Sequence, residues 1–265
     1  MRLVILTSSR NGTAAHLLPI LVSHGVQGIA MVILNEGNGP NRATLVRRKL
    51  RKILTIGVFG AFIGKRMRRW YTEDVQQLLA IGDLEAICTA NGIPFRTTPS
   101  INSTTTVDLF KEAKADLGVS LGNGYIGRKV FELPRNGMIN IHHELLPAYQ
   151  NAQSVIWQLY NMSSTTGYTI HRIDRQIDTG DILLSATVPV AFKNSLRETV
   201  AHTYASLLTA SAHGLVKLLA TFDHQLLAAI PQGRGQRYTT PSLWQFLRIV
   251  RNHRLLRQAS VTRMA

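Results

Sequence analysis

An amide and an imidazole stand two residues apart in Asn140-Ile141-His142, at the end of a short apolar run that begins at Met138. Successive side chains of a β-strand point to opposite faces, so Asn140 and His142 would share one face and Ile141 would pack on the other. Two such groups aimed at one point suit a carbonyl that becomes a tetrahedral oxyanion, and losing one donor of this kind typically costs about 10²–10³ in rate. A nearby carboxylate could orient the imidazole, hold it charged, or accept the proton of an amine through water.

Polar side chains also fill two other loops, and each of these follows a predicted strand. The three loops run from Leu121 to Ile126, from Asn140 to Pro147 and from Asp174 to Asp181. In an open, mostly parallel sheet, ligands bind where the carboxyl ends of the strands meet. We therefore expect the three loops to border one ligand site.

The elements that must position these loops alternate between strands and helices. Apolar runs predict strands over Arg2–Leu6, Gly28–Leu34, Ile93–Arg96, Asp116–Leu121, Met138–His142, Gly167–Ile173 and, as an antiparallel partner, Ile182–Val190. Helical spacing predicts helices over Thr13–Ser23, Glu73–Asn91, Thr106–Ala113, Ser154–Tyr160 and Leu196–Thr221, and Gly37–Pro40 breaks the pattern. The expected fold class is α/β: a Rossmann-like, open, mostly parallel twisted sheet with helices on both faces.

The stretch from residue 137 to residue 181 resembles the folate-dependent formyltransferase family. This family includes methionyl-tRNA formyltransferase, glycinamide ribonucleotide transformylase and the sugar-nucleotide N-formyltransferases. Its motifs stand here in order, as Asn140-Ile141-His142, Leu145-Leu146-Pro147, Gly167-Tyr168-Thr169-Ile170-His171 and Asp178-Thr179-Gly180. The resemblance covers about residues 1–225, apart from a basic insertion at residues 42–70, and implies the formyltransferase fold for that catalytic domain. Residues 226–265 would form a basic C-terminal extension.

The resemblance implies a one-carbon transferase that uses 10-formyltetrahydrofolate as co-substrate and formylates a primary amine. Asn140 and His142 would polarise the formyl oxygen, and Asp178 would assist removal of the proton. The cofactor-binding residues implied are Leu121, Gly122, Asn123, Gly124, Tyr125, Ile126, Asp174, Ile177 and Thr179. No metal is expected, because the adjacent His142 and His143 point oppositely on a strand and no H-E-x-x-H helix occurs.

The acceptor is where this chain departs from its family. Many members carry Arg-Gly where this chain has Gln150-Asn151, and Glu144 replaces a small residue, so both changes are expected where the amine approaches. An amino sugar on a nucleotide is the favoured acceptor, because about 40 residues after the long helix leave no room for the β-barrel of the tRNA-specific member. Formylation of an aminoacyl-tRNA, formyltetrahydrofolate hydrolysis with water as acceptor, and a non-catalytic binding protein that kept the fold are the alternatives.

Several neighbouring polar residues have simpler interpretations than catalysis. His143 is expected to be structural or exposed. His171 would either support His142 or be satisfied in the core. Asp174 and Asp181 are expected to cap loops.

Positive charge is concentrated in two segments of the chain. Residues 42–69 hold ten Lys and Arg and no acid, and residues 233–265 hold seven Arg and no acid. The remainder has 13 of the 30 basic residues against 15 acidic ones. The net charge of +15 therefore describes what these segments contact rather than the chemistry of the core.

The two basic segments are predicted to be helical. The uncharged run from Ile53 to Gly64 is too short for a bilayer span of roughly 20 residues. It suits a helix on an anionic membrane surface, or one docked on the protein with solvated ends. Arg248, Arg251, Arg254 and Arg257 would form a stripe on a C-terminal helix, and segments 42–69 and 242–258 could contact a membrane, a tRNA or solvent.

The chain has one cysteine, Cys88, which is expected in the core, so no intramolecular disulfide can form. The apolar start, Leu3 to Leu6, is too short for a signal peptide. These features predict a cytoplasmic protein, and the basic segments would allow it to lie against the inner face of the membrane.

Overall fold

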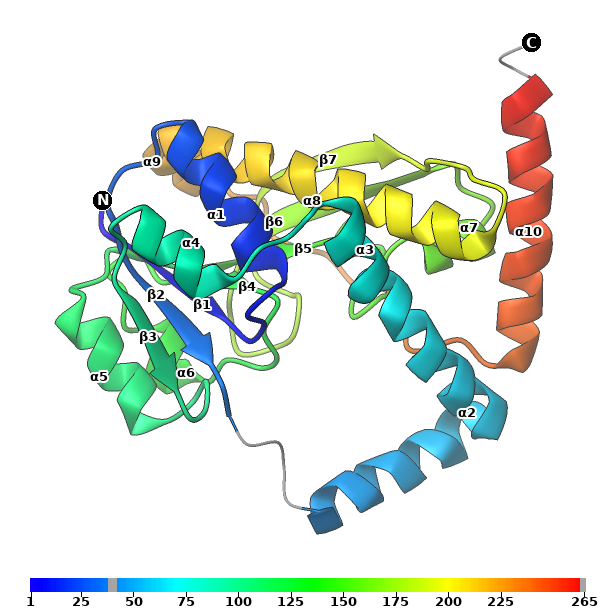
Figure 1. The fold of residues 1–265 in the computed structure, drawn as a ribbon, viewed down its shortest axis with the longest axis horizontal. Coiled ribbons are helices and arrows are strands. Elements are labelled where there is room, and N and C mark those ends of the chain that lie inside the picture. The colour runs from blue at the N-terminus through cyan, green and yellow to red at the C-terminus, as the bar shows by residue number, and fades with distance from the viewer. Residues whose placement is uncertain (38–41, 263–265) are drawn as a thin grey trace.

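Seven strands form one sheet in the order β3-β2-β1-β4-β5-β6-β7 in the computed structural model, which describes residues 1–37 and 42–262 (Figure 1). The strands are β1 (Leu3–Thr7), β2 (Ile29–Asn35), β3 (Phe95–Thr98), β4 (Leu117–Leu121), β5 (Met138–His142), β6 (Thr165–Arg172) and β7 (Ile182–Pro189). The first five pair in parallel, whereas β6 and β7 are antiparallel to their neighbours. The predicted α/β fold with a mostly parallel sheet is confirmed.

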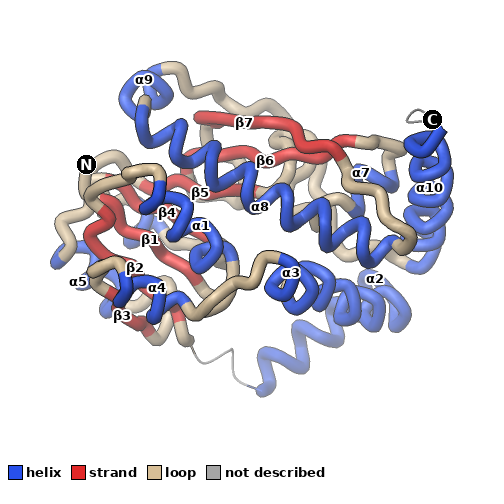
Figure 2. The backbone as a smooth tube through the Cα atoms, turned by 45° about the horizontal axis from the view of Figure 1, so that its top comes forward, coloured by secondary structure: helices blue, strands red, loops and turns tan. Residues whose placement is uncertain are grey.

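Helices cover both faces of the sheet (Figure 2). Helices α1 (Thr13–Ser23), α4 (Leu84–Ala90) and α8 (Leu196–Ala220) pack on one face, and α5 (Thr104–Glu112) and α6 (Arg128–Phe131) pack on the other. Strand β1 contributes to a hydrophobic core on each face of the sheet. Leu3 and Ile5 belong to the core under α1, α4 and α8, whereas Val4 and Leu6 belong to the core under α5 and α6. Strands with both faces covered read as continuous apolar runs.

One predicted helix is wrong in its extent. The stretch from Glu73 to Asn91 forms two helices, α3 (Glu73–Leu78) and α4, separated by a turn in which Ala80 has φ +47°. Asp83 then starts α4 by accepting a hydrogen bond from Ala86 N at 3.0 Å, a cap that helical periodicity alone does not reveal. The short helices α6 and α9 (Phe222–Leu227) were not predicted, since they are barely longer than one turn.

The basic insertion forms helix α2 (Arg42–Tyr71), which is kinked at Gly57, where φ is 75° and ψ is 166°. The half after the kink packs on the body through Ile63, Met67 and Trp70, and the half before it extends away from the sheet (Figure 1). The expected break at Gly37–Pro40 falls largely outside the described residues, as do the side chains of Arg42, Arg48, Lys49, Arg51 and Lys52.

The C-terminal extension contains the expected helix, α10 (Leu243–Thr262), packed against α7 (Ile156–Tyr160). The buried Asn252 side chain donates to the carbonyl oxygens of Leu159 and Tyr160, both at 2.9 Å. It thereby supplies hydrogen bonds to carbonyl groups at the end of α7 that have no partner within the helix. His253 contacts Thr199 Oγ1 of α8 at 2.9 Å. The extension is therefore fixed to the catalytic domain by buried polar contacts.

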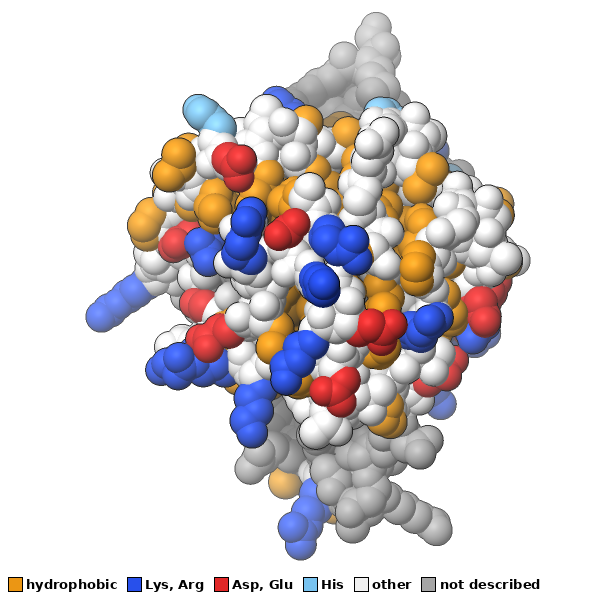
Figure 3. All heavy atoms as spheres, turned by 90° about the vertical axis from the view of Figure 1, so that its left-hand side faces the viewer, with side chains coloured by type: hydrophobic (Ala, Val, Ile, Leu, Met, Phe, Trp, Pro, Cys, Tyr) orange, Lys and Arg blue, Asp and Glu red, His pale blue; other side chains and the backbone are white. Residues whose placement is uncertain are grey.

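Charge is mixed on the end of the molecule away from α2 and α10. Figure 3 shows Lys and Arg side chains interspersed with Asp and Glu over this face. Across residues 1–37 and 42–262, no helix combines the length and the apolar character needed to span a membrane.

Candidate active site

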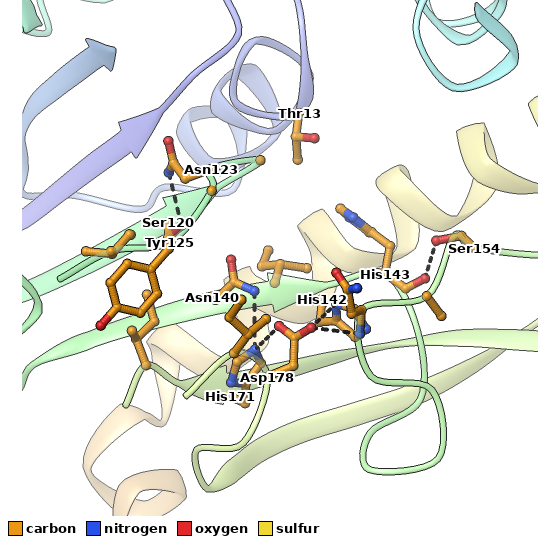
Figure 4. A pocket seen from close by; sticks show the side chains of 18 of the residues that line it. Thr13, Ser120, Asn123, Tyr125, Asn140, His142, His143, Ser154, His171 and Asp178 are labelled. Atoms are coloured by element: carbon orange, nitrogen blue, oxygen red, sulfur yellow. Dashed lines mark hydrogen bonds and ion pairs between the residues drawn. The ribbon is translucent and has the colours of Figure 1, made fainter. Parts of the chain in front are cut away.

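A cavity of about 470 Å³ opens at the carboxyl ends of β4 and β5. Asn140 and His142 project into it from the end of β5, as the two-residue spacing predicts, while the Ile141 side chain belongs to the core (Figure 4). Asp178, which lies 36 residues after His142 in sequence, reaches the same cavity from the loop between β6 and β7. The three residues named as catalytic from the sequence therefore lie together.

The Asp178 carboxylate lies between two imidazoles. Its Oδ2 is 3.6 Å from His142 Nδ1, and its Oδ1 is 3.7 Å from His171 Nε2. The backbone N–H of Asn151 donates to Oδ2 at 3.1 Å and helps to fix the carboxylate. All three side chains of this cluster are almost fully buried, so their charges interact with little screening by solvent.

Backbone carbonyl groups orient both imidazoles. His142 Nε2 donates to the carbonyl oxygen of Tyr149 at 2.8 Å, which turns Nδ1 toward Asp178. His171 Nδ1 donates to the carbonyl oxygen of Arg172 at 2.8 Å, which leaves Nε2 to accept from Asn140 Nδ2 at 3.2 Å. One hydrogen of the Asn140 amide therefore holds the side chain in place, and the other remains for a ligand.

His171 is a member of the site rather than a satisfied core residue alone. Burial lowers its pKa, and the Asp178 carboxylate opposes that shift. A neutral ring is the form that can accept the Asn140 hydrogen bond. The sequence left two roles open for His171, and the structure places it against Asn140 and Asp178 instead of directly against His142.

A steric constraint explains why glycine occupies position 180 in Asp178-Thr179-Gly180. Asp178 has φ +57°, so the chain turns sharply, and Gly180 then passes close to the backbone of Arg172 at the end of β6. A Cβ atom at position 180 would overlap the Arg172 carbonyl oxygen. The close approach sets the position from which Asp178 enters the cavity.

We expect Gly180→Ala to lower the free energy of unfolding by about 1–3 kcal/mol, the usual cost of forcing an extra methyl group into a packed place. The loop must also move, so turnover should fall together with stability. Denaturant unfolding and steady-state kinetics measure the two effects. Gly233→Ala is the matched control, because a Cβ atom there meets no atom within 4 Å. Equal stability of the two variants would contradict the steric explanation.

Most of the predicted cofactor-binding residues border the cavity. They are Gly122, Asn123, Gly124, Tyr125, Ile126, Asp174 and Ile177. Leu121 instead lies in the core at the end of β4, and Thr179 Oγ1 donates to both oxygens of Asp174, at 2.8 and 2.9 Å. Asp174 also accepts from Gln176 N at 2.9 Å, so its carboxylate caps the loop as expected.

Other residues that line the cavity were not predicted as site residues. Thr13 comes from the start of α1, Ser120 from β4, and Tyr204 from α8. Gln153 also borders the cavity, and its Oε1 is buried without a hydrogen-bond partner in the described part of the chain. Tyr204 lies within the helix predicted over Leu196–Thr221, and nothing in the local sequence separates a cavity-lining tyrosine from a core tyrosine.

His143 borders the cavity and is partly buried, whereas Glu144 lies in the core beneath it. Burial, with a smaller contribution from His142, lowers the pKa of His143 to about 3, and its ring packs edge-on against Tyr204. His143 Nε2 also contacts Ser211 Oγ at 3.2 Å, so α8 holds the ring in the cavity wall, which fits the structural role expected for it. Glu144 does not border the cavity: it is fully buried, accepts from Val155 N at 3.1 Å, and contacts the Gln158 amide. The expectation that Glu144 meets the acceptor is wrong, because its side chain points into the core.

Burial raises the pKa of Glu144 well above its ordinary value, and hydrogen bonds from Gln158 and Val155 oppose the shift. Gln158 Oε1 is buried without a partner among the described residues, and a protonated Glu144 carboxyl could donate to it if the amide turned by 180°. The native protein therefore keeps a proton on Glu144 that the unfolded chain loses above about pH 4.3.

Stability should consequently fall as pH rises above that value, by about 1.4 kcal/mol per pH unit until the folded pKa is reached. Glu144→Gln removes this titration and keeps the shape, so its stability relative to the native chain should increase as the pH rises above about 4.3. Urea unfolding of both proteins at several pH values measures the difference. A difference that does not change with pH would contradict a protonated Glu144.

The cavity has two ends. Figure 4 shows Tyr125 on one side and Ser154 on the other, with Asn140, His142 and Asp178 between them. The Ser154 end is bordered by Asn151, and Gln150 behind it donates to the carbonyl oxygen of Asp178 at 3.2 Å. Such a cavity can hold two reactants that meet at the central residues.

The C-terminal extension supports the Ser154 end. Gln150 N donates to the carbonyl oxygen of Gln236, and Tyr238 N donates to that of Gln150, both at 2.9 Å. The Tyr149 and Tyr238 rings stack with their centroids 5.4 Å apart. The residues that replace the family's Arg-Gly pair are thus held by a segment far along the chain.

No group of three or more His, Cys, Asp or Glu side chains that could bind a metal ion occurs in the part of the chain that the structure describes. The side chains that line the cavity supply amides, hydroxyl groups, imidazoles and the carboxylates of Asp174 and Asp178.

Comparison with known proteins gives consistent matches. The family model described as formyl transferase matches residues 73–219. Methionyl-tRNA formyltransferase of Alkaliphilus oremlandii is 30% identical over 155 residues, which are 58% of this chain and 49% of that protein. This chain spans half or less of the length of such curated relatives.

Solved structures share the fold. Phosphoribosylglycinamide formyltransferase of Bacillus halodurans is 18% identical with a TM-score of 0.54, covering 83% of this chain and 97% of that chain. The N-formyltransferase of Helicobacter canadensis, in complex with folinic acid and dTDP-3-aminofucose, is 14% identical with a TM-score of 0.51, covering 96% of this chain and 80% of that one.

Proposed function

The chain belongs to the formyl transferase family, and on that basis we propose that it transfers a formyl group from 10-formyltetrahydrofolate to a primary amine. The observation that carries the proposal is the meeting of Asn140, His142 and Asp178 in one cavity, with the carboxylate 3.6 Å from the imidazole. An amide donor, an imidazole and a buried carboxylate around one point are the groups that acyl transfer to an amine requires.

Each residue has a distinct task in this proposal. Asn140 donates its free amide hydrogen to the formyl oxygen, where negative charge develops as the amine attacks. The Tyr149 carbonyl holds His142 Nε2, so Nδ1, which lies 3.6 Å from Asp178 Oδ2, is the ring atom that faces the reacting groups and can contribute a second polar group at the formyl oxygen. Asp178 also receives the proton that the amine loses as the new C–N bond forms, directly or through water. The bond from the formyl carbon to N10 of the carrier then breaks, and N10 takes up that proton and leaves as a neutral amine.

The Tyr125 end of the cavity fits the folate co-substrate. The whole cavity, of about 470 Å³, is in the range of small-molecule sites, roughly 300–1,000 Å³. The two loops that border it, residues 122–126 and 173–178, present backbone groups next to the exposed Tyr125 and Ile177 side chains. Such a lining can bind a flat heterocycle by stacking and backbone hydrogen bonds.

The favoured acceptor is an amino sugar carried on a nucleotide, which would enter at the Ser154 end. Two observations support this assignment. Gln153 borders this end of the cavity, and its side-chain amide, whose Oε1 has no hydrogen-bond partner among the described residues, could turn to accept from an N–H or O–H group of the sugar. The Helicobacter canadensis enzyme, whose complex contains dTDP-3-aminofucose, matches 96% of this chain.

A second candidate acceptor is an aminoacyl-tRNA. The curated relatives at about 30% identity are methionyl-tRNA formyltransferases, and the Arg-rich extension could supply phosphate contacts. This candidate requires retention of charged initiator tRNA that weakens steeply as salt rises.

The test is to incubate the protein with 10-formyltetrahydrofolate and a panel of amino-sugar nucleotides, and to search by mass spectrometry for acceptors that have exchanged one hydrogen for a formyl group. Parallel reactions contain methionyl initiator tRNA or no amine. Formylated tRNA alone would replace the sugar-nucleotide assignment. Formate released without any amine would identify a hydrolase, and no turnover in any arm would refute transferase activity.

A further inference from the structure

Helix α2 exposes large apolar side chains on both sides of its kink. Leu50 and Leu54 lie before Gly57, and Val58 and Phe62 lie after it. Leu54 is 87% exposed and Val58 is 74% exposed, so neither contributes to the core. Exposed apolar side chains that occur singly are ordinary. Here two pairs, each with a spacing of four residues, lie on either side of the kink of one protruding element, which is typical of an interaction surface.

The half of α2 after the kink has two faces. Ile63, Met67 and Trp70 are buried against the body. The opposite face carries Val58 and Phe62, followed by the exposed basic residues Lys65, Arg66 and Arg69. The helix therefore uses one stripe for folding and leaves the other, which is apolar and then basic, in solvent.

Helix α10 adds to this surface from the far end of the sequence. The Phe59 and Phe246 rings lie 6.3 Å apart, which places the start of α10 beside the kink (Figure 1). Trp244 and Leu247 in its first two turns are exposed. We call the set the α2–α10 corner, defined as Leu50, Leu54, Val58, Phe62, Trp244 and Leu247.

We propose that the α2–α10 corner docks the protein on an anionic membrane surface. Apolar side chains in the corner would enter the boundary between headgroups and acyl chains, and the neighbouring Lys65, Arg66 and Arg251 would contact lipid phosphates. Residues 42–69 contain no acid, which is the charge pattern that anionic lipid attracts and that the mixed face in Figure 3 lacks.

A membrane accounts for the exposed apolar groups, which a nucleic acid does not. Phosphate contacts with RNA need Lys and Arg alone, whereas Leu54 and Val58 gain nothing from a phosphate backbone. Burying a leucine or valine side chain contributes about 1.5–3 kcal/mol. The combination of apolar side chains with basic neighbours is characteristic of helices that lie in a membrane interface.

The corner is separate from the proposed reaction site. Among the described residues that line the cavity, none belongs to α2 or α10. Docking could therefore change where the protein lies without changing the chemistry, and the two proposals can fail independently.

Flotation with vesicles tests the proposal with the full chain. One set of vesicles is phosphatidylcholine alone, and the other has equal parts of phosphatidylcholine and phosphatidylglycerol. We expect binding to the second set only. The double variant Leu54→Glu/Val58→Glu should lower the partition coefficient at least about tenfold, because two apolar contacts are lost and two repelled charges are added.

A matched control exists at the other end of the molecule. Leu227 and Ile230, which are 91% and 64% exposed, lie at and just after α9, so Leu227→Glu/Ile230→Glu adds the same charges away from the corner and should leave binding unchanged. Lys65→Gln/Arg66→Gln should lower the partition coefficient about thirtyfold, at about 1 kcal/mol per basic residue. Thermal unfolding of each variant separates loss of binding from loss of folding.

Three outcomes would overturn the proposal. One is equal binding to both sets of vesicles, and another is equal behaviour of the corner variant and its control. The third is retention of bulk tRNA that the Lys65 and Arg66 substitutions abolish and the Leu54 and Val58 substitutions leave intact, which would assign the corner to RNA.

Discussion

Asp178→Asn is expected to lower kcat for the proposed formyl transfer by about 10³, within the range for loss of a general acid–base group. The substitution removes the negative charge that lies 3.6 Å from His142 Nδ1 and 3.7 Å from His171 Nε2. An amide can neither stabilise an imidazolium by charge nor take up the proton of the amine. Binding of the folate should change little, so the effect should appear in kcat rather than in KM.

Asparagine is the right replacement at this position for a conformational reason. Asp178 has φ +57°, which Asn tolerates better than most residues, and the Asn oxygen can still accept from Asn151 N. Asp181→Asn, in the same loop outside the cavity lining, is the matched control and should keep its turnover. Single-turnover assays with unchanged thermal unfolding make the comparison. A loss below about tenfold would mean that Asp178 is not the proton acceptor.

Asn140→Ala is expected to lower kcat by about 10²–10³, the usual cost of one lost oxyanion donor. It also leaves His171 Nε2 without the hydrogen bond that it accepts from Asn140 at 3.2 Å. Asn136→Ala, at the opposite end of β5, removes a remote amide and should have no such effect. Asn140→Ala combined with Asp178→Asn should cost less than the product of the two single losses, because groups that act as a unit are not additive. Full turnover of Asn140→Ala would contradict its role at the formyl oxygen.

The sequence was sufficient to predict the part of the site that lies on strand β5. Strand β5 runs from Met138 to His142, as predicted, and a period of two fixes which side chains share a face. The apolar runs were sufficient for the sheet as well, because buried parallel strands are continuous in hydrophobicity and the order of elements restricts the topology. The other predicted strand ends differ from the observed ones by at most two residues, because hydrogen-bonded ends depend on neighbouring strands.

Contacts between backbone groups that lie far apart along the chain could not be predicted from the sequence. The left-handed conformation of Asp178, which brings its carboxylate between two rings, follows from the close passage of Gly180 by Arg172, and no local pattern contains that distance. The role of the Tyr149 carbonyl in orienting His142 has no side chain to reveal it. The burial of Glu144 was mispredicted because its partners, Val155 N and the Gln158 amide, satisfy a carboxyl group that composition alone would place in solvent.

The kink of α2 was also not predictable. Gly57 adopts φ 75° within a stretch whose flanking residues have ordinary helical spacing. Glycine permits this conformation but does not require it. The packing of Ile63, Met67 and Trp70 on the body decides the direction of the second half of the helix.

The hydrogen bonds between Gln150 and residues 236 and 238 set an order of events during synthesis. All seven strands, and both Asn140 and Asp178, leave the ribosome well before the segment that holds the acceptor end of the cavity. A nascent chain can thus build the sheet while its pocket still lacks one wall. The acceptor end of the cavity should therefore be complete only after Tyr238 has emerged and docked beside Tyr149.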